Sequence, residues 1–246
     1  MIIFYDIDSN LPGRAFSPNT WKTRFTLNYK GIPYKTEWFE FVDIQSHCES
    51  LSIVPKSRRS NGELYYSLPA IWDTTTGVKM CESLEILEYL EKTYPDQPTL
   101  FPGNTKGLQL AFQEGIMHTG FSALFPFIIP DEIPVFSPRS REFFVSSREQ
   151  YMGIALKDMK PTGERAEKEW AKFKAGLEVL SGWYEATDGP FLMGDTIGWA
   201  DIAMASWILW IKLVYENDPR WKDVSSWSGG RWERLLDDVK PYTTID

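Results

Sequence analysis

Blocks of apolar and polar positions predict a strand, a helix and a second strand at the start of the chain. Residues 2–5 are apolar and end at Asp6, as in a short buried strand. Aromatic residues then recur every four positions, which places them on one helical face: Trp21, Phe25 and Tyr29. Residues 34–41 again have the pattern of a strand. The connection is long enough for a parallel strand–helix–strand unit.

Cap and turn residues mark the limits of this predicted helix. Ser17 is a good N-cap, and Pro18 suits the first helical position because its missing N–H would have no partner there. Gly31 ends the helix, and Pro33 shortly afterwards cannot continue it. We therefore expect a helix that presents a serine hydroxyl at its N-terminus.

The mixed pattern continues after the second strand. Residues 43–62 are ambiguous and contain a possible short helix followed by a basic stretch. Residues 68–73 and 77–81 predict two strands joined by a turn. Ser83 then opens a helix that ends near Tyr94.

Near residue 103 the pattern changes to helices alone. A linker rich in glycine and proline covers residues 100–107. Helical periodicity follows over residues 106–125, 138–160, 164–186 and 199–216. Four prolines between 126 and 138 predict an irregular or kinked segment. The sequence therefore indicates a mixed α/β domain over residues 1–98 and an all-helical domain over residues 99–246.

Composition narrows the class of protein. Of the 246 residues, 43% are apolar, 24% are charged and 15% are aromatic, which is ordinary for a globular protein apart from the aromatic excess. The net charge of −8 argues against nucleic acid, which needs a concentrated basic face. The longest apolar run, residues 202–211, is too short to cross a bilayer, and residues 1–6 lack the basic region of a signal peptide. We expect a cytoplasmic protein with no membrane or nucleic-acid partner.

Cysteine and histidine are scarce. Cys48 and Cys81 cannot form a dense disulfide framework, so we interpret both as structural residues of a reducing compartment. With only His47 and His118 beside them, a zinc site is not expected. His118 lies beside apolar residues of a predicted helix, where a core or surface position competes with one facing a substrate cleft.

Four short motifs occur in order along the chain. They are Ser17-Pro18-Asn19-Thr20-Trp21-Lys22-Thr23-Arg24, Leu68-Pro69, Glu82-Ser83, and Gly194-Asp195-Thr196-Ile197-Gly198-Trp199-Ala200-Asp201-Ile202. In this order and at these spacings, the set resembles the cytosolic glutathione transferases over essentially the whole chain. The resemblance implies the glutathione transferase fold, an α/β thioredoxin-like N-terminal domain plus an all-α C-terminal domain. It also implies glutathione as co-substrate and a homodimer.

A narrower likeness is also visible. The first motif, followed by Lys30-Gly31, resembles the bacterial β-etherases, which cleave lignin aryl ethers with glutathione. Residues 53–69 resemble the fungal etherase-related class. The implied reaction is attack of the glutathione thiolate on hydrophobic aromatic electrophiles, by conjugation or aryl-ether cleavage, with no metal. A ligandin-type carrier of aromatic compounds with little turnover is the main alternative, and a fold used only for protein contacts is another.

The resemblance assigns roles around glutathione. Ser17 stabilises the thiolate, and the backbone of Leu68, turned by a cis bond to Pro69, pairs with the cysteinyl amide. Glu82 takes the α-ammonium group, and Ser83 at a helix N-terminus takes the α-carboxylate. The glycyl carboxylate needs a cation, and three on the preceding loop are alternatives: Arg58, Lys56 and Arg59.

The chemistry suits the serine. A free thiol has a pKa of roughly 8.5, and lowering it by about two units takes roughly 2.7 kcal/mol of preferential thiolate stabilisation. A helix N-terminus supplies unpaired N–H groups and a positive dipole end. We expect the Ser17 hydroxyl to donate to the sulfur while accepting from the Thr20 N–H. Unlike cysteine, serine forms no mixed disulfide. Tyr5 is the alternative donor.

Aromatic residues are candidates for a second-substrate cleft between the predicted domains. We select Phe121 and Phe125, together with Tyr5 as a wall residue. Helical spacing makes core positions an open alternative for such residues.

The last motif concerns folding. Asp201 lies three residues into a predicted helix, so its carboxylate can accept from the Gly198 N–H as half of a capping box. We therefore reject a metal site built on Asp195 and Asp201. The family usually has Ser or Thr where Gly198 stands, so the side-chain half of the box is missing and the helix start is expected to be weaker.

Overall fold

Two compact units make up the chain in the computed structural model, which describes residues 1–59 and 61–246. The first unit contains residues 1–99, 135–144 and 242–246. The second unit contains residues 100–134 and 145–241. The first unit thus includes two segments that follow its sheet by many residues, and the sequence pattern did not indicate them.

The first unit is built on a mixed sheet. Its strands are β1 (Ile2–Ile7), β2 (Tyr34–Phe39), β3 (Ala70–Asp73) and β4 (Lys79–Cys81), in the order β2-β1-β3-β4 within the described residues. β1 and β2 are parallel, which confirms the predicted strand–helix–strand unit, and β3 is antiparallel to both β1 and β4. All six residues of β1 are buried, as expected for a central strand.

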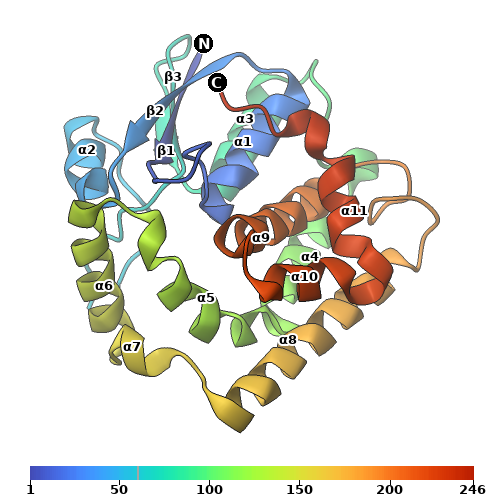
Figure 1. Cartoon of the computed structure of the whole chain (residues 1–246). Helices are drawn as coiled ribbons and strands as arrows, with labels where there is room; N and C mark the ends of the chain where they lie inside the picture. The colour runs from blue at the N-terminus through green and yellow to red at the C-terminus, as the bar shows by residue number, and fades with distance from the viewer. Residues whose placement is uncertain (60) are drawn as a thin grey trace. The chain divides into compact units, whose positions relative to one another are not determined.

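The helices of the first unit are α1 (Pro18–Lys30), α2 (Ile44–Ser50) and α3 (Ser83–Thr93), with a 3-10 turn η1 (Phe41–Asp43). α1 and α3 lie side by side against the sheet (Figure 1). They enclose a core that is fully apolar: Ile2, Phe4, Leu27, Ile32, Ile71, Ile86 and Leu90. α1 ends at Gly31 with φ +63, a conformation that glycine adopts without strain, so the predicted limits of this helix are confirmed.

The second unit is helical. Its elements are η2 (Pro102–Asn104), α4 (Lys106–His118), η3 (Phe121–Ala123), α5 (Phe125–Asp131), η4 (Ile133–Val135), α6 (Pro138–Met152), α7 (Leu156–Met159), α8 (Gly163–Tyr184), α9 (Trp199–Tyr215), α10 (Pro219–Ser226), η5 (Trp227–Gly230), α11 (Arg231–Asp238) and η6 (Lys240–Tyr242). The last residues of η4 and η6 and the first turns of α6 belong to the first unit. α8 and α9 match the predicted helices within two residues.

Two predicted helices end earlier than expected. The helix predicted over residues 106–125 stops at His118 because the chain crosses α8 closely there. A Cβ at Gly120 would lie 2.8 Å from the Gly176 Cα, and Gly120 has φ +140. The helix predicted over residues 138–160 stops at Met152, and Gly153 follows with φ +68. The proline-rich stretch, expected to be irregular or kinked, is divided into the short α5, with Pro130 inside it, and the 3-10 turn η4.

The start of α9 carries the predicted carboxylate cap. The Gly198 N–H donates to Asp201 at 2.8 Å, and the Leu192 N–H donates to the same carboxylate at 2.9 Å. Gln109 of α4 supplies what glycine lacks, because its Oε1 accepts from the Ala200 N–H at 2.8 Å. The expected weakness is therefore compensated from another helix. Burial raises the pKa of Asp201 to about 6.

None of the described helices combines the length and apolar character needed to span a bilayer.

Candidate functional site

Ser17 lies at the N-terminus of α1. Its carbonyl accepts from the Trp21 N–H at 3.0 Å and from the Thr20 hydroxyl at 3.1 Å. The prediction that the Ser17 hydroxyl accepts from the Thr20 N–H is wrong, because the side chain makes no cap hydrogen bond. The Thr20 hydroxyl instead turns back to the Ser17 carbonyl. Although Ser17 is only 7% exposed, no described residue bonds to its hydroxyl.

The sheet register gathers the other predicted residues at one end of the sheet. Tyr5, near the end of β1, is opposite Ala70, the first residue of β3, and Ala70 is opposite Cys81 at the end of β4. The Leu68–Pro69 bond just before Ala70 is cis, as predicted. Leu68 lies outside the β3 ladder, so its N–H and C=O are not committed to the sheet. The starts of α1 and α3 follow the ends of β1 and β4, and both therefore belong to this end.

Glu82 connects β4 to α3 in a strained conformation. Its φ is +73, which is unusual for a residue other than glycine and is found most often at functional sites. The Ser57 hydroxyl donates to its carboxylate at 2.7 Å. Ser83 follows as the first residue of α3, where its N–H and hydroxyl meet the positive end of the helix dipole. The sequence did not indicate Ser57, because its contact with Glu82 spans 25 residues.

Each of the three candidate cations has a partner in the structure. The Arg58 guanidinium donates to the Gly62 carbonyl at 2.8 Å within its own loop. Lys56 forms an ion pair with Glu85 of α3 at 2.6 Å, and Arg59 stacks over the Tyr65 ring at 5.1 Å. None of these contacts identifies which cation meets the glycyl carboxylate, so the choice of Arg58 stays a prediction.

The residues predicted for the second-substrate site lie in three settings. Tyr5 is buried and stacks on Phe39 with ring centroids 5.0 Å apart, and burial with the Glu37 charge raises the pKa of its hydroxyl to about 12. Phe121 is buried in the second unit against Phe173. Phe125 is half-buried beside Trp207. Their assignment to a substrate site stays a prediction.

A phenylalanine cluster lies next to Ser17 and was missed from the sequence. Phe16 contacts Phe136 edge-on at 5.2 Å, and Phe136 stacks on Phe144 at 4.5 Å. Phe41 contacts Phe136 and Phe144, and the 40%-exposed Phe143 borders it. Phe136 lies within the proline-rich stretch, and Phe143 and Phe144 follow it, so only the fold brings them to the first unit.

A buried ion pair supports the inner face of α1. Arg24 and Asp6 have fully buried side chains and approach to 2.7 Å. Burial raises the pKa of Asp6, and the Arg24 guanidinium opposes that rise. Arg24 also donates to Thr36 of β2 and lies over the Phe4 ring. Arg24 follows Trp21 by three residues on the buried face of α1, which is the signal that could have marked it.

Both cysteines are free and buried. Burial raises the pKa of the Cys48 thiol to about 11 and that of Cys81 to about 12, so each is a protonated thiol at neutral pH. This environment suits a structural role rather than a nucleophilic one. Among the residues that the structure describes, no group of three or more metal-binding side chains is found.

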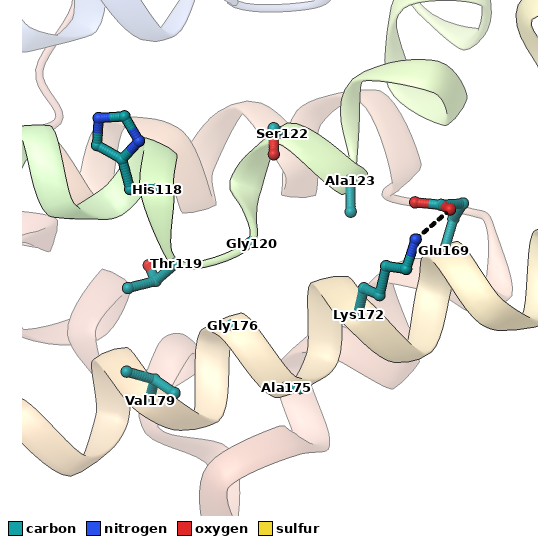
Figure 2. Close-up of a pocket in the computed structure, with 10 residues that line it drawn as sticks. All are labelled: His118, Thr119, Gly120, Ser122, Ala123, Glu169, Lys172, Ala175, Gly176 and Val179. Atoms are coloured by element: carbon teal, nitrogen blue, oxygen red, sulfur yellow. Dashed lines mark hydrogen bonds and ion pairs between the residues drawn. The ribbon is translucent and has the colours of Figure 1, made fainter.

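A separate groove occupies the second unit between the end of α4 and α8 (Figure 2). Its volume is about 460 Å³, and Gly120 and Gly176 lie along it. His118 lines one part of it, and Lys172 and Glu169 form an ion pair in another. The groove includes none of the residues predicted for glutathione.

These features define a class of protein. A mixed sheet with a cis proline before β3, a serine at the start of α1 and a following helical unit form the glutathione transferase fold. The family model for the glutathione S-transferase N-terminal domain matches residues 16–93, and that for the C-terminal domain matches residues 107–242.

Individual relatives agree with this assignment. A glutathione S-transferase-like protein of Aspergillus flavus, ustS, is 32% identical, and the match covers 94% of this chain and 87% of that protein. A glutathione S-transferase of Ceriporiopsis subvermispora, solved in complex with glutathione, is 40% identical with a TM-score of 0.93, covering 100% of this chain and 98% of that one. Glutathione transferase GSTFuA3 of Phanerochaete chrysosporium is 35% identical with a TM-score of 0.92, over 100% and 98% of the two chains. This chain belongs to the glutathione S-transferase family.

Proposed function

We propose that this chain binds glutathione at the end of the sheet where Ser17, Leu68 and Ser83 gather, and transfers it to hydrophobic aromatic electrophiles. The observation that carries the proposal is the Ser17 hydroxyl, which has no described protein partner and stands at the N-terminus of α1. The relative from Ceriporiopsis subvermispora, whose structure contains glutathione, supports the choice of ligand.

The proposed reaction starts with the thiol. The glutathione thiol loses its proton to solvent, and Ser17 donates a hydrogen bond to the resulting thiolate, which lowers the thiol pKa. The sulfur then attacks the electrophilic carbon. In conjugation by addition, the S–C bond forms as a multiple bond of the electrophile opens, and the anion that results takes up a proton. In conjugation by displacement, the S–C bond forms as the bond to the leaving group breaks, and that group departs as an anion. In the etherase-like variant the S–C bond forms as the C–O bond breaks, and the aryloxide leaves and takes up a proton. Leu68 holds the cysteinyl amide, while Glu82 and Ser83 hold the γ-glutamyl end.

The test compares wild type, Ser17→Ala and Ser17→Thr with glutathione and two electrophiles, a fluorescent β-aryl ether and a generic isothiocyanate. We expect turnover to fall about tenfold to a hundredfold in Ser17→Ala, which loses a hydrogen bond to a charged atom, and to recover in part in Ser17→Thr, which keeps a hydroxyl. Equal rates in wild type and Ser17→Ala would remove Ser17 from the mechanism and favour Tyr5 or a backbone N–H.

A carrier function is the alternative that the same experiment tests. Tight binding of aromatic compounds without turnover, in wild type and Ser17→Ala alike, would replace the transferase by the carrier.

We also propose that the chain is a cytoplasmic homodimer. The free thiols of Cys48 and Cys81 suit a reducing compartment. Light scattering coupled to size-exclusion chromatography tests the dimer, and a mass of one chain at micromolar concentration would contradict it.

A further inference from the structure

The loop that leads to Ser17 is irregular and is closed by its own polar residues. This Ser17 loop, residues 8–16, connects β1 to α1. Arg14 pairs with Asp8 through two contacts of 2.7 and 2.6 Å, and the Ser9 hydroxyl donates to the Arg14 carbonyl. The Arg14 side chain is 47% exposed and that of Asp8 31%, so water screens this pair. These contacts tie the loop mainly to itself.

A distant segment fixes the Ser17 loop at both ends. This returning segment, residues 135–144, comes back to the first unit after the chain has entered the second. The Asn10 N–H donates to the Val135 carbonyl at 2.8 Å, and the Asn10 side-chain amide donates to the next carbonyl, of Phe136, at 2.7 Å. At the other end, the Phe16 ring meets the Phe136 ring edge-on at 5.2 Å. Phe16 is the residue immediately before Ser17.

The returning segment is itself firmly held. The Ser137 and Ser140 hydroxyls both donate to the Glu40 carboxylate, at 2.5 and 2.6 Å. Arg139 pairs with Asp43 in η1. These bonds attach the returning segment to the chain that follows β2. It can therefore serve as a fixed reference for the Ser17 loop.

We propose that Asn10 and Phe136 are positioning residues for Ser17. They fix the loop that delivers the hydroxyl, and they do so through contacts that involve neither glutathione nor the hydroxyl. A hydrogen bond weakens steeply when its distance or angle departs from the optimum, so a small displacement of the loop reduces thiolate stabilisation. This inference rests on the proposed function, in which Ser17 donates to the glutathione sulfur.

The experiment measures the thiol pKa of bound glutathione by ultraviolet absorbance of the thiolate against pH, together with Tm, in Asn10→Ala. Asn10 is exposed at the surface, so the variant is expected to fold. The matched control is Asn28→Ala. Asn28 lies near the far end of α1, and its side-chain amide donates to the Tyr242 and Thr244 carbonyls at 2.7 and 2.9 Å. Both variants lose amide-to-carbonyl bonds that span the sequence, but only Asn10 contacts the returning segment.

We expect Asn10→Ala to raise the thiol pKa by about one unit, a roughly tenfold smaller thiolate fraction at a pH below the pKa, because the bond to the sulfur loses part of its strength. Asn28→Ala should lower Tm without moving the thiol pKa. Phe136→Leu, which keeps the backbone carbonyl but loses the edge contact, should give a smaller rise.

The variants separate two kinds of failure. An unchanged thiol pKa in Asn10→Ala, with a raised one in Ser17→Ala, would overturn the positioning role and leave the proposed function standing. Equal shifts in Asn10→Ala and Asn28→Ala would also overturn it, because general loosening would then explain both. An unchanged thiol pKa in Ser17→Ala would overturn the proposed function and this inference together.

Discussion

The start of α9 offers a sharp test, because Gln109 occupies the place of the usual cap side chain. A Cβ at Gly198 would lie 2.7 Å from Gln109 Nε2 and 2.8 Å from its Oε1. Gln109 is 2% exposed, and its Oε1 is the acceptor for the buried Ala200 N–H. The Gln109 side chain therefore caps α9 in the space that a cap side chain at position 198 would otherwise fill.

The magnitude follows from these contacts. Gln109→Ala removes a cap worth about 1 kcal/mol and leaves the Ala200 N–H buried without a partner, for a total loss of about 2–3 kcal/mol. For a chain of this size, that corresponds to a fall in Tm of about 5–10 °C. Gly198→Ser should also destabilise, because its Cβ displaces the amide of Gln109.

The double variant tests whether Gln109 and Gly198 are energetically coupled. In Gln109→Ala with Gly198→Ser, the serine has room and its hydroxyl can accept an N–H of the first turn of α9. We expect the double variant to lose less unfolding free energy than the two single variants lose together, by about 1 kcal/mol or more. Thermal and urea unfolding followed by circular dichroism measure all four proteins.

Gln113 provides the control, one turn further along α4. Its Oε1 accepts from the Trp199 indole at 2.7 Å and caps no backbone group. Gln113→Ala combined with Gly198→Ser should therefore be additive. An unchanged Tm in Gln109→Ala, or additive losses in its double variant with Gly198→Ser, would show that Gln109 does not replace the missing cap of α9.

Two further predictions concern buried charges. Burial raises the pKa of Glu132 from its usual value of 4.5 to about 7. The native state therefore keeps a proton that the unfolded chain releases. The stability that this group contributes is full below about pH 4.5 and is lost as pH rises through about 7. Glu132→Gln can still accept a hydrogen bond from the Trp210 indole. It should remove this pH dependence and have an unfolding free energy up to about 3 kcal/mol above that of wild type at about pH 8. Urea unfolding across pH measures this, and a wild-type pH profile in the variant would contradict it. Arg24→Met leaves the Asp6 carboxylate buried without its cation and should cost about 3–5 kcal/mol of unfolding free energy, with partial recovery when Asp6→Asn is added. Denaturant unfolding of both variants measures this, and a loss under about 1 kcal/mol in Arg24→Met would show that water reaches Asp6.

Much of the site could be predicted because its parts are local in sequence. Ser17 and Pro18 mark the start of α1, and Gly31 marks its end, through interactions within one helical turn. The carboxylate cap from Asp201 to Gly198 spans three residues and was likewise predictable. The cis bond at Pro69 was predicted from the family resemblance rather than from the local pattern.

What the sequence left open depends on residues that only the fold brings together. The local pattern predicted that the Ser17 hydroxyl accepts from the Thr20 N–H, whereas in the structure it makes no such bond and the Thr20 hydroxyl donates to the Ser17 carbonyl. The helix predicted through Gly120 stops early because α8 passes within contact distance, a fact that lies outside α4 itself.

The sequence by itself determined the four strands, the limits of α1, α3, α8 and α9 to within two residues, and the order of the motifs, because each depends on side chains within a few positions of one another. The tertiary structure alone decided that Ser57 contacts Glu82, that Gln109 caps α9, and that the chain returns at Phe136 to hold the Ser17 loop. These contacts join residues 25 to 126 positions apart. The residues next to either partner in the sequence do not indicate such a contact. It forms only when the packing of helices and strands brings the two side chains together.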